Sequence, residues 1–238
     1  AYDQKDCLGS ANMPEDVALR GVDYLLEHSA EQTHPLAISF YGGAPLLRFP
    51  LLKKVVAYAK RRAQEKNKPI GFSVTTNGTL LNASIAKFLI SHSVQMVIGL
   101  DGPRETHDRH RLFKKGGGSF DVVTAALEMV RNMDADYFDR LVRCSVVVTA
   151  GADLEELQAY FRGLHVNIIA NFVDTYGLNA TKLGSAQAVT GLSALKTRMA
   201  ARLGEEGSAF LNQEGMSKDF AAVLLSPMIK RFMAADRS

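Results

Sequence analysis

Glycine and small polar residues recur at four places where an apolar segment of the chain ends. They are the stretches Tyr41-Gly42-Gly43, Thr75-Thr76-Asn77-Gly78 and Asp101-Gly102-Pro103, and the pair Asn171 and Asp174. Asn-Gly and Asp-Gly-Pro are also ordinary turn sequences, so each one alone is typical of a loop. Their recurrence favours a single ligand-binding edge, because ligands of parallel α/β folds bind at the carboxyl ends of the strands.

A charged stretch, HDRHR at residues 107–111, adds candidates for binding an anion or a metal ion. Arg111 carries a planar guanidinium that can hold a carboxylate with two hydrogen bonds; the alternative is an arginine on a solvated loop. His107 and His110, with Asp108 between them, have a spacing that metal ligands can share. In an arginine-rich loop such histidines are more typical of solvated or cofactor-flanking positions, so no metal site is predicted.

The segments that must position these residues alternate between the hydrophobic periods of strands and helices. Short β-branched or apolar runs predict strands over residues 36–41, 70–76, 95–100, 141–149 and 166–173. Apolar residues at helical spacing predict helices over residues 14–30, 51–64, 83–91, 120–132 and 154–162. This alternation favours an α/β fold with a parallel sheet and right-handed crossovers over a β-sandwich.

No strand pattern follows residue 183, where helices are predicted over residues 193–203 and 218–234, the second with Pro227 as a kink. The expected organisation is therefore a (β/α) core over residues 1–180 and a helical C-terminal extension over residues 181–238.

Two further residues have structural interpretations. Cys144 lies inside the apolar run RCSVVV and is expected to be a buried small hydrophobe. The glycines at 116–118 lack the lysine of a phosphate-binding loop and are interpreted as a flexible segment, with Ser119 capping the helix that follows.

Composition excludes several classes of partner. The net charge of +3 is scattered along the chain, and the basic run from Lys60 to Arg62 fits a solvated helix face better than a nucleic-acid surface. Two cysteines, Cys7 and Cys144, make neither a disulfide framework nor, alone, a metal site. No apolar run reaches the roughly 18 to 20 residues that span a bilayer. We expect a soluble, cytoplasmic protein without nucleic-acid or membrane partners.

Five motifs, in this order, resemble the radical SAM superfamily, specifically its anaerobic sulfatase maturases and related peptide-modifying enzymes. They are FYGGAPLL, TTNGTLL, GLDGP, HDRHR and GGGSF, within residues 13–173. The resemblance implies an open (β/α)6 barrel, S-adenosylmethionine, and a [4Fe-4S] cluster held by a CxxxCxxC loop after the first strand. It also implies a 5'-deoxyadenosyl radical, a peptide or protein substrate, and an electron donor such as ferredoxin or flavodoxin.

The resemblance assigns cofactor-binding roles, although no catalytic residue. Gly42, Gly43 and Pro45 match a loop that binds the amino group of S-adenosylmethionine, and the glycines let backbone carbonyls approach it. Arg111 matches the residue that pairs with the cofactor's carboxylate. The full set of implied cofactor-binding residues is Tyr41, Gly42, Gly43, Ala44, Pro45, Thr76, Asn77, Gly99, Asp101 and Arg111.

The cluster ligands depart from the family pattern. Only Cys7 lies near the N-terminus, where the family has three cysteines. The first barrel strand is missing too, and AYDQKD resembles the sequence that follows the last cluster cysteine. We therefore expect the ligands to precede Ala1 rather than to have been lost, and the fold here to be a partial barrel lacking its first strand.

Further departures concern the pocket and the C-terminal region. Ala44 stands where the family usually has glutamate, whose charge-assisted hydrogen bond would contribute about 1.5 to 3 kcal/mol. Gly99 stands where close relatives carry a serine that contacts the cofactor. No cysteine follows Cys144, so the cysteine-rich C-terminal domain of peptide maturases has no counterpart in this sequence.

Three functions follow from these observations. The first is a radical SAM enzyme that modifies a peptide or protein by hydrogen abstraction. The second, motivated by Ala44 and Gly99, is a catalytically silent scaffold that binds a peptide or partner protein. The third is an ordinary (β/α) barrel enzyme that uses Asp101 or Asp174 with Arg111 on a small substrate.

Overall fold

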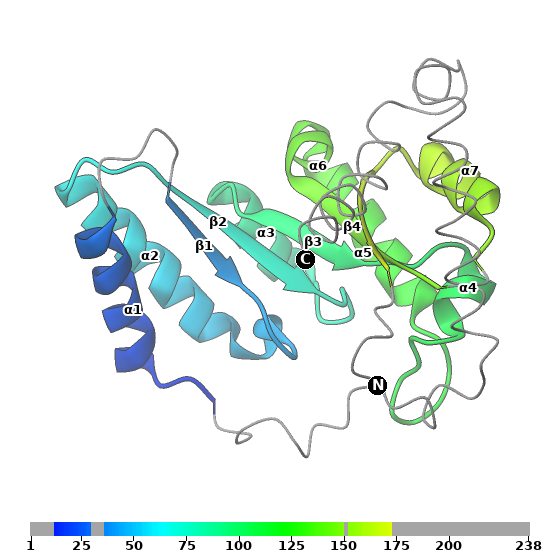
Figure 1. Ribbon diagram of the computed structural model, residues 1–238, viewed down its shortest axis with the longest axis horizontal. Coiled ribbons are helices and arrows are strands. Elements are labelled where there is room, and N and C mark those ends of the chain that lie inside the picture. The colour runs from blue at the N-terminus through cyan, green and yellow to red at the C-terminus, as the bar shows by residue number, and fades with distance from the viewer. Residues whose placement is uncertain (1–11, 30–35, 150–151, 173–238) are drawn as a thin grey trace, which may run out of the picture. The chain divides into compact units, whose positions relative to one another are not determined.

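The computed structural model describes residues 12–29, 36–149 and 152–172. Parallel strands alternate with helices along this part of the chain (Figure 1). The elements in order are α1 (Glu15–His28), β1 (Leu36–Phe40), the 3-10 helix η1 (Pro45–Arg48), α2 (Phe49–Glu65), β2 (Ile70–Thr76), α3 (Ala83–Ser91), β3 (Gln95–Gly99), α4 (Arg104–Asp108), α5 (Phe120–Met133), α6 (Ala135–Leu141), β4 (Val142–Val148), α7 (Leu154–Leu164) and β5 (Asn167–Phe172).

The five strands form one sheet in the chain order β1-β2-β3-β4-β5, which is not closed into a barrel. The pairs β1/β2, β3/β4 and β4/β5 are parallel, with Ser39 beside Ser73 in the first and Gly99 beside Ser145 in the second. This confirms the predicted α/β class and the open parallel sheet. The chain divides into two compact units, residues 1–74 and 75–238, which we describe separately.

In the first unit, α1 and α2 pack against each other through apolar side chains. Val22 and Leu26 of α1 are buried, as are Val56 and Ala59 of α2. At the rim of this contact, Asp23 accepts hydrogen bonds from the Tyr58 hydroxyl at 2.7 Å and from Nε of Arg62 at 3.0 Å. These two bonds hold the pKa of Asp23 below its usual value.

In the second unit, the buried residues alternate along each strand, as a sheet covered on one face requires. In β4, Val142, Cys144, Val146 and Val148 are buried and the residues between them are half-buried. The buried side chains of α5, which include Val123 and Leu127, belong to a helix that contacts α3, α4 and α6. The burial predicted for Cys144 is confirmed, and burial raises the pKa of its thiol to about 12.

The structure contains short helices that the sequence did not predict. They are η1, α4 and α6, each of seven residues or fewer. So short an element covers two turns at most and shows no hydrophobic period, which is why patterning missed it. Local contacts stabilise α6: the Asp134 side chain accepts a hydrogen bond from Tyr137 N–H at 2.8 Å, and the buried Tyr137 hydroxyl donates to the Val94 carbonyl.

The expected role of Ser119 is wrong. Its side chain makes no capping hydrogen bond to α5. Instead Asp108 supplies the cap, because its Oδ1 accepts a hydrogen bond from Phe120 N–H at 2.9 Å. The Ser119 hydroxyl is engaged elsewhere, donating to the Arg111 carbonyl at 2.9 Å.

Several expectations lie outside the described residues. They are the boundary near residue 180, the helices at 193–203 and 218–234, and the environments of Cys7 and Asp174. Among the described helices, none has both the length and the apolar character needed to cross a membrane.

Candidate cofactor-binding site

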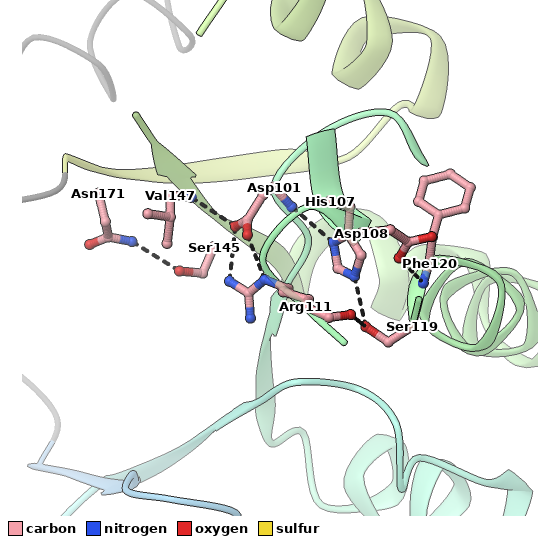
Figure 2. Close-up of polar contacts among 9 residues, drawn as sticks. All are labelled: Asp101, His107, Asp108, Arg111, Ser119, Phe120, Ser145, Val147 and Asn171. Atoms are coloured by element: carbon pink, nitrogen blue, oxygen red, sulfur yellow. Dashed lines mark hydrogen bonds and ion pairs between the residues drawn. The ribbon is translucent and has the colours of Figure 1, made fainter. Parts of the chain in front are cut away.

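A buried ion pair lies just beyond the carboxyl end of β3. Asp101, only 5% exposed, accepts hydrogen bonds from Nε of Arg111 at 2.6 Å and from Nη2 at 2.9 Å. Oδ1 of Asp101 also accepts the backbone N–H of Val147, at 2.9 Å (Figure 2). The carboxylate is thereby fixed on β4, and the guanidinium is fixed on the carboxylate.

Arg111 keeps one edge of its guanidinium available for a ligand. In the part of the chain that the structure describes, its side-chain hydrogen bonds run from Nε and Nη2 to Asp101. The side chain is 26% exposed, so Nη1 and the second N–H of Nη2 can bind an anion. Arginine binds carboxylates through just such a pair of N–H groups.

Gly99, the last residue of β3, makes room for this guanidinium. A Cβ built on Gly99 would lie 2.6 Å from Nη1 of Arg111 and 3.0 Å from its Cζ. Carbon does not approach nitrogen so closely without displacing it. Arg111 can therefore lie in this position only because residue 99 has no side chain.

His107, on α4, is fully buried beside the ion pair. Its Nδ1 accepts the backbone N–H of Asp101 at 3.3 Å, and its Nε2 lies 3.0 Å from the Ser119 hydroxyl. Burial, followed by the nearby charge of Arg111, lowers the pKa of His107 below its usual 6.5. Of the two kinds of position expected for this histidine, solvated or cofactor-flanking, burial excludes the solvated one for His107, whose ring makes a T-shaped contact with Phe120.

Thr76 and Asn77 shape the turn at the end of β2. Thr76 is buried and its Oγ1 accepts the N–H of Gly78 at 3.2 Å. Oδ1 of the exposed Asn77 accepts hydrogen bonds from the N–H and the hydroxyl of Thr79 at 3.2 and 2.9 Å. These contacts leave the amide nitrogen of Asn77 to donate to a ligand.

The predicted residues 41–45 belong to the first unit. Gly42 has a φ of +137°, which L side chains rarely adopt, whereas open space surrounds its Cα. Ala44 precedes η1, where its carbonyl accepts the N–H of Leu47 at 3.0 Å and Pro45 is the first helical residue. Backbone conformation, rather than crowding, therefore requires glycine at position 42. The structure brings Gly99, Asp101 and Arg111 together in the second unit.

One polar pair contains a residue that the sequence did not single out. Nδ2 of Asn171, on β5, donates to the hydroxyl of Ser145, on β4, at 2.9 Å, and both side chains are accessible. Ser145 lies beside Gly99 in the sheet. The signal that could have found it is the strand alternation in RCSVVV, which places Ser145 on the face opposite to Cys144.

The chemistry of these residues decides which groups the site could hold. The outer edge of Arg111 fits the carboxylate of an amino-acid-like ligand. Among the described residues, no three His, Cys, Asp or Glu side chains are placed to hold a metal ion. The two cysteines of the sequence are also fewer than an iron–sulfur cluster needs, so these residues do not fit a cluster.

Comparison with known proteins decides the family. The model of the Radical SAM superfamily matches residues 11–159, more than half of the chain. The chain belongs to the radical SAM superfamily. This confirms the resemblance, and with it S-adenosylmethionine and a [4Fe-4S] cluster as the cofactors of the family.

The curated relatives that the chain resembles include anaerobic sulfatase-maturating enzymes. A cysteine-type anaerobic sulfatase-maturating enzyme of Clostridium perfringens (strain 13 / Type A) is 28% identical over 126 residues, which are 53% of this chain and 33% of that enzyme. A serine-type enzyme of Bacteroides thetaiotaomicron is 28% identical over 116 residues, 48% of this chain and 28% of that enzyme. The chain thus spans about a third of the length of these relatives.

Solved structures show the same fold. The structure described as native anSMEcpe with bound AdoMet matches with a TM-score of 0.66 and 22% identity, over 88% of this chain and 56% of that one. The same protein with bound AdoMet and Kp18Cys peptide also matches with a TM-score of 0.66, over 89% of this chain and 57% of that one. The open parallel sheet is therefore the radical SAM fold.

Proposed function

We propose that the protein is a radical SAM enzyme that modifies a peptide or protein by abstracting a hydrogen atom from a substrate side chain. The observation that carries the proposal is the guanidinium of Arg111, anchored on Asp101 with its outer edge available to a carboxylate. Membership of the superfamily supports S-adenosylmethionine as the molecule that owns this carboxylate.

The chain's own residues bind and orient in this proposal. When bound and reductively cleaved, S-adenosylmethionine supplies the 5'-deoxyadenosyl radical of the family. Arg111 holds the carboxylate with two charge-assisted hydrogen bonds, and Asp101 fixes the plane of the guanidinium. In the same unit, Asn77 donates a further hydrogen bond from its amide.

A peptide or protein substrate is the finer part of the proposal. It is supported by the relatives named as sulfatase-maturating enzymes and by the similar fold that was solved with AdoMet and a peptide. A cytoplasmic location and an electron donor such as ferredoxin or flavodoxin complete it.

The test is anaerobic reconstitution of the intact protein, with the cluster verified by its absorbance and iron content. We expect 5'-deoxyadenosine to form from S-adenosylmethionine, and Arg111→Ala to weaken cofactor binding by roughly 10- to 100-fold. Arg140→Ala is the matched control, because Arg140 also binds an aspartate, Asp136, through Nε and Nη2, but on the exposed surface of α6. A verified cluster without 5'-deoxyadenosine would contradict the proposal.

Ala44→Glu separates an enzyme from a silent scaffold. An enzyme that binds S-adenosylmethionine through this loop gains a charge-assisted hydrogen bond, so its affinity should rise by about 10-fold or more. A silent scaffold should bind a peptide, as measured by calorimetry. In that case Ala44→Glu should not produce cofactor binding.

A further inference from the structure

His107 joins the backbones of the two residues that form the buried ion pair. Its Nδ1 lies 3.3 Å from the N–H of Asp101, and its Nε2 lies 3.0 Å from the hydroxyl of Ser119. That hydroxyl lies 2.9 Å from the carbonyl of Arg111. The imidazole and the hydroxyl therefore bridge two backbone positions that are ten residues apart (Figure 2).

The chemistry of these partners assigns every proton in the bridge. A backbone N–H can only donate, so Nδ1 of His107 must accept and carry no proton. The proton of the neutral ring is then on Nε2, which donates a hydrogen bond to the Ser119 hydroxyl. That hydroxyl in turn donates a hydrogen bond to the carbonyl of Arg111. Among the described residues, no buried side-chain nitrogen or oxygen lacks a hydrogen-bond partner.

The ion pair closes these contacts into a ring. From the backbone of Arg111 the contacts continue through its side chain to the carboxylate of Asp101, whose own N–H begins the series. We call this set, Asp101, His107, Ser119 and Arg111, the positioning ring. Since the N–H of Val147 also binds Asp101, the ring is attached to β4.

We propose that neutral His107, in its Nε2–H form, is the residue that positions Arg111: through the positioning ring it aims the outer edge of the guanidinium at an anionic ligand group. This inference rests on the proposed function only in naming that group as the carboxylate of S-adenosylmethionine. Neither His107 nor Ser119 contacts the ligand edge of Arg111 itself; both act through its backbone.

The charges around His107 show what protonation would do. The groups that face the imidazole of His107 are Asp101 beyond β3, Asp108 on α4, Arg111 in the following loop, and the ring of Phe120 at the start of α5. Burial and Arg111 favour the neutral ring, and outweigh the two carboxylates. A proton on Nδ1 would point at the N–H of Asp101, so the charged form must break the positioning ring.

Nuclear magnetic resonance of the intact protein tests the proposal without the cofactor. The ¹⁵N shifts of the His107 ring should report the neutral Nε2–H form at pH 7. The N–H signal of Arg111 Nε, assigned through its loss in Arg111→Lys, should exchange slowly because Asp101 holds it. A charged ring, or a proton on Nδ1, would overturn the proposal, and the ¹⁵N shifts of the wild-type ring show this without any variant.

Four variants then separate positioning from packing. His107→Asn keeps an amide near Nδ1, His107→Gln keeps one near Nε2, and Ser119→Ala removes only the hydroxyl. Each of these three variants should speed hydrogen exchange at Arg111 Nε. Each should also weaken S-adenosylmethionine binding by about tenfold, the effect of one lost hydrogen bond. His110→Gln, the same change on an exposed histidine of this stretch, should alter neither.

The two readouts distinguish this proposal from the proposed function. If Arg111 Nε exchange is unchanged in Ser119→Ala and in both His107 variants, the positioning role is wrong, even if the protein binds S-adenosylmethionine. If the variants release Arg111 but the wild-type protein binds no S-adenosylmethionine, the positioning role stands and the proposed function fails.

Discussion

Gly99, which departs from the family pattern, and Arg111, which matches it, are in direct contact. From the sequence, Gly99 is a lost cofactor contact, because relatives have serine there. In the structure the space at Gly99 is filled by Arg111, since an added Cβ would lie 2.6 Å from Nη1. The glycine thus permits the ion pair of Arg111 with Asp101.

Gly99→Ala should therefore displace the guanidinium and weaken S-adenosylmethionine binding by about tenfold, the equivalent of one hydrogen bond. Isothermal titration calorimetry measures the change. Gly71→Ala is the control, because this strand glycine has only ordinary contact, 3.9 Å from its added Cβ to the Leu36 carbonyl. Equal losses of affinity in the two variants would show that replacing any strand glycine weakens binding, whether or not it contacts Arg111.

At the scale of elements, α4 and α5 are joined by a contact that glycine makes possible. Asp108, the last residue of α4, caps α5 at Phe120 N–H. A Cβ on Gly118 would lie 1.9 Å from Cγ of Asp108, so this carboxylate occupies the space beside Gly118. The third glycine of the GGGSF motif, Gly118, is thus required by the cap.

Gly118→Ala should lower the free energy of unfolding by about 1 to 3 kcal/mol, because it combines overpacking with loss of a helix cap. Urea denaturation followed by circular dichroism measures it. Gly163→Ala, in α7 where the added Cβ meets nothing within 4 Å, should instead stabilise by about 0.5 to 1 kcal/mol through helix propensity. Destabilisation by both changes would contradict this explanation.

The elements that the sequence predicted are those whose burial alternates with a regular period. The strands and the helices longer than seven residues are of this kind, as β4 shows with Cys144 buried and Ser145 half-buried. The sequence also named Gly99, Asp101 and Arg111 as candidate site residues, and the structure brings these three together. It did not predict that Arg111 fills the space at Gly99, because that contact joins residues twelve apart through a loop that no local pattern describes.

At the scale of the whole molecule, His107 makes stability depend on pH. Its pKa is lowered in the folded state, so the unfolded chain binds the proton more tightly. The contribution is fully present above the unfolded pKa of about 6.5, and it is lost as the pH falls from there through the folded pKa. The two aspartates with lowered pKa values, Asp23 and Asp121, change the stability only at more acidic pH, as the pH falls below 3.8.

The free energy of unfolding of the wild type should therefore decrease as the pH is lowered from 7 to 5. The free energy of unfolding of His107→Gln should decrease less steeply over the same range. Chemical denaturation at several pH values measures both slopes, with His110→Gln expected to follow the wild type. Parallel slopes for the wild type and His107→Gln would assign the pH dependence to other groups.

The buried thiol of Cys144 can report how often strand β4 becomes uncovered. With no exposed surface and a pKa raised to about 12, the sulfur is neither accessible nor ionised while β4 stays covered. Alkylating reagents attack the thiolate, so they can reach Cys144 only during excursions that uncover the strand. The rate at which Cys144 is alkylated thus measures how often β4 is uncovered. A cofactor that closes the core would lower that rate.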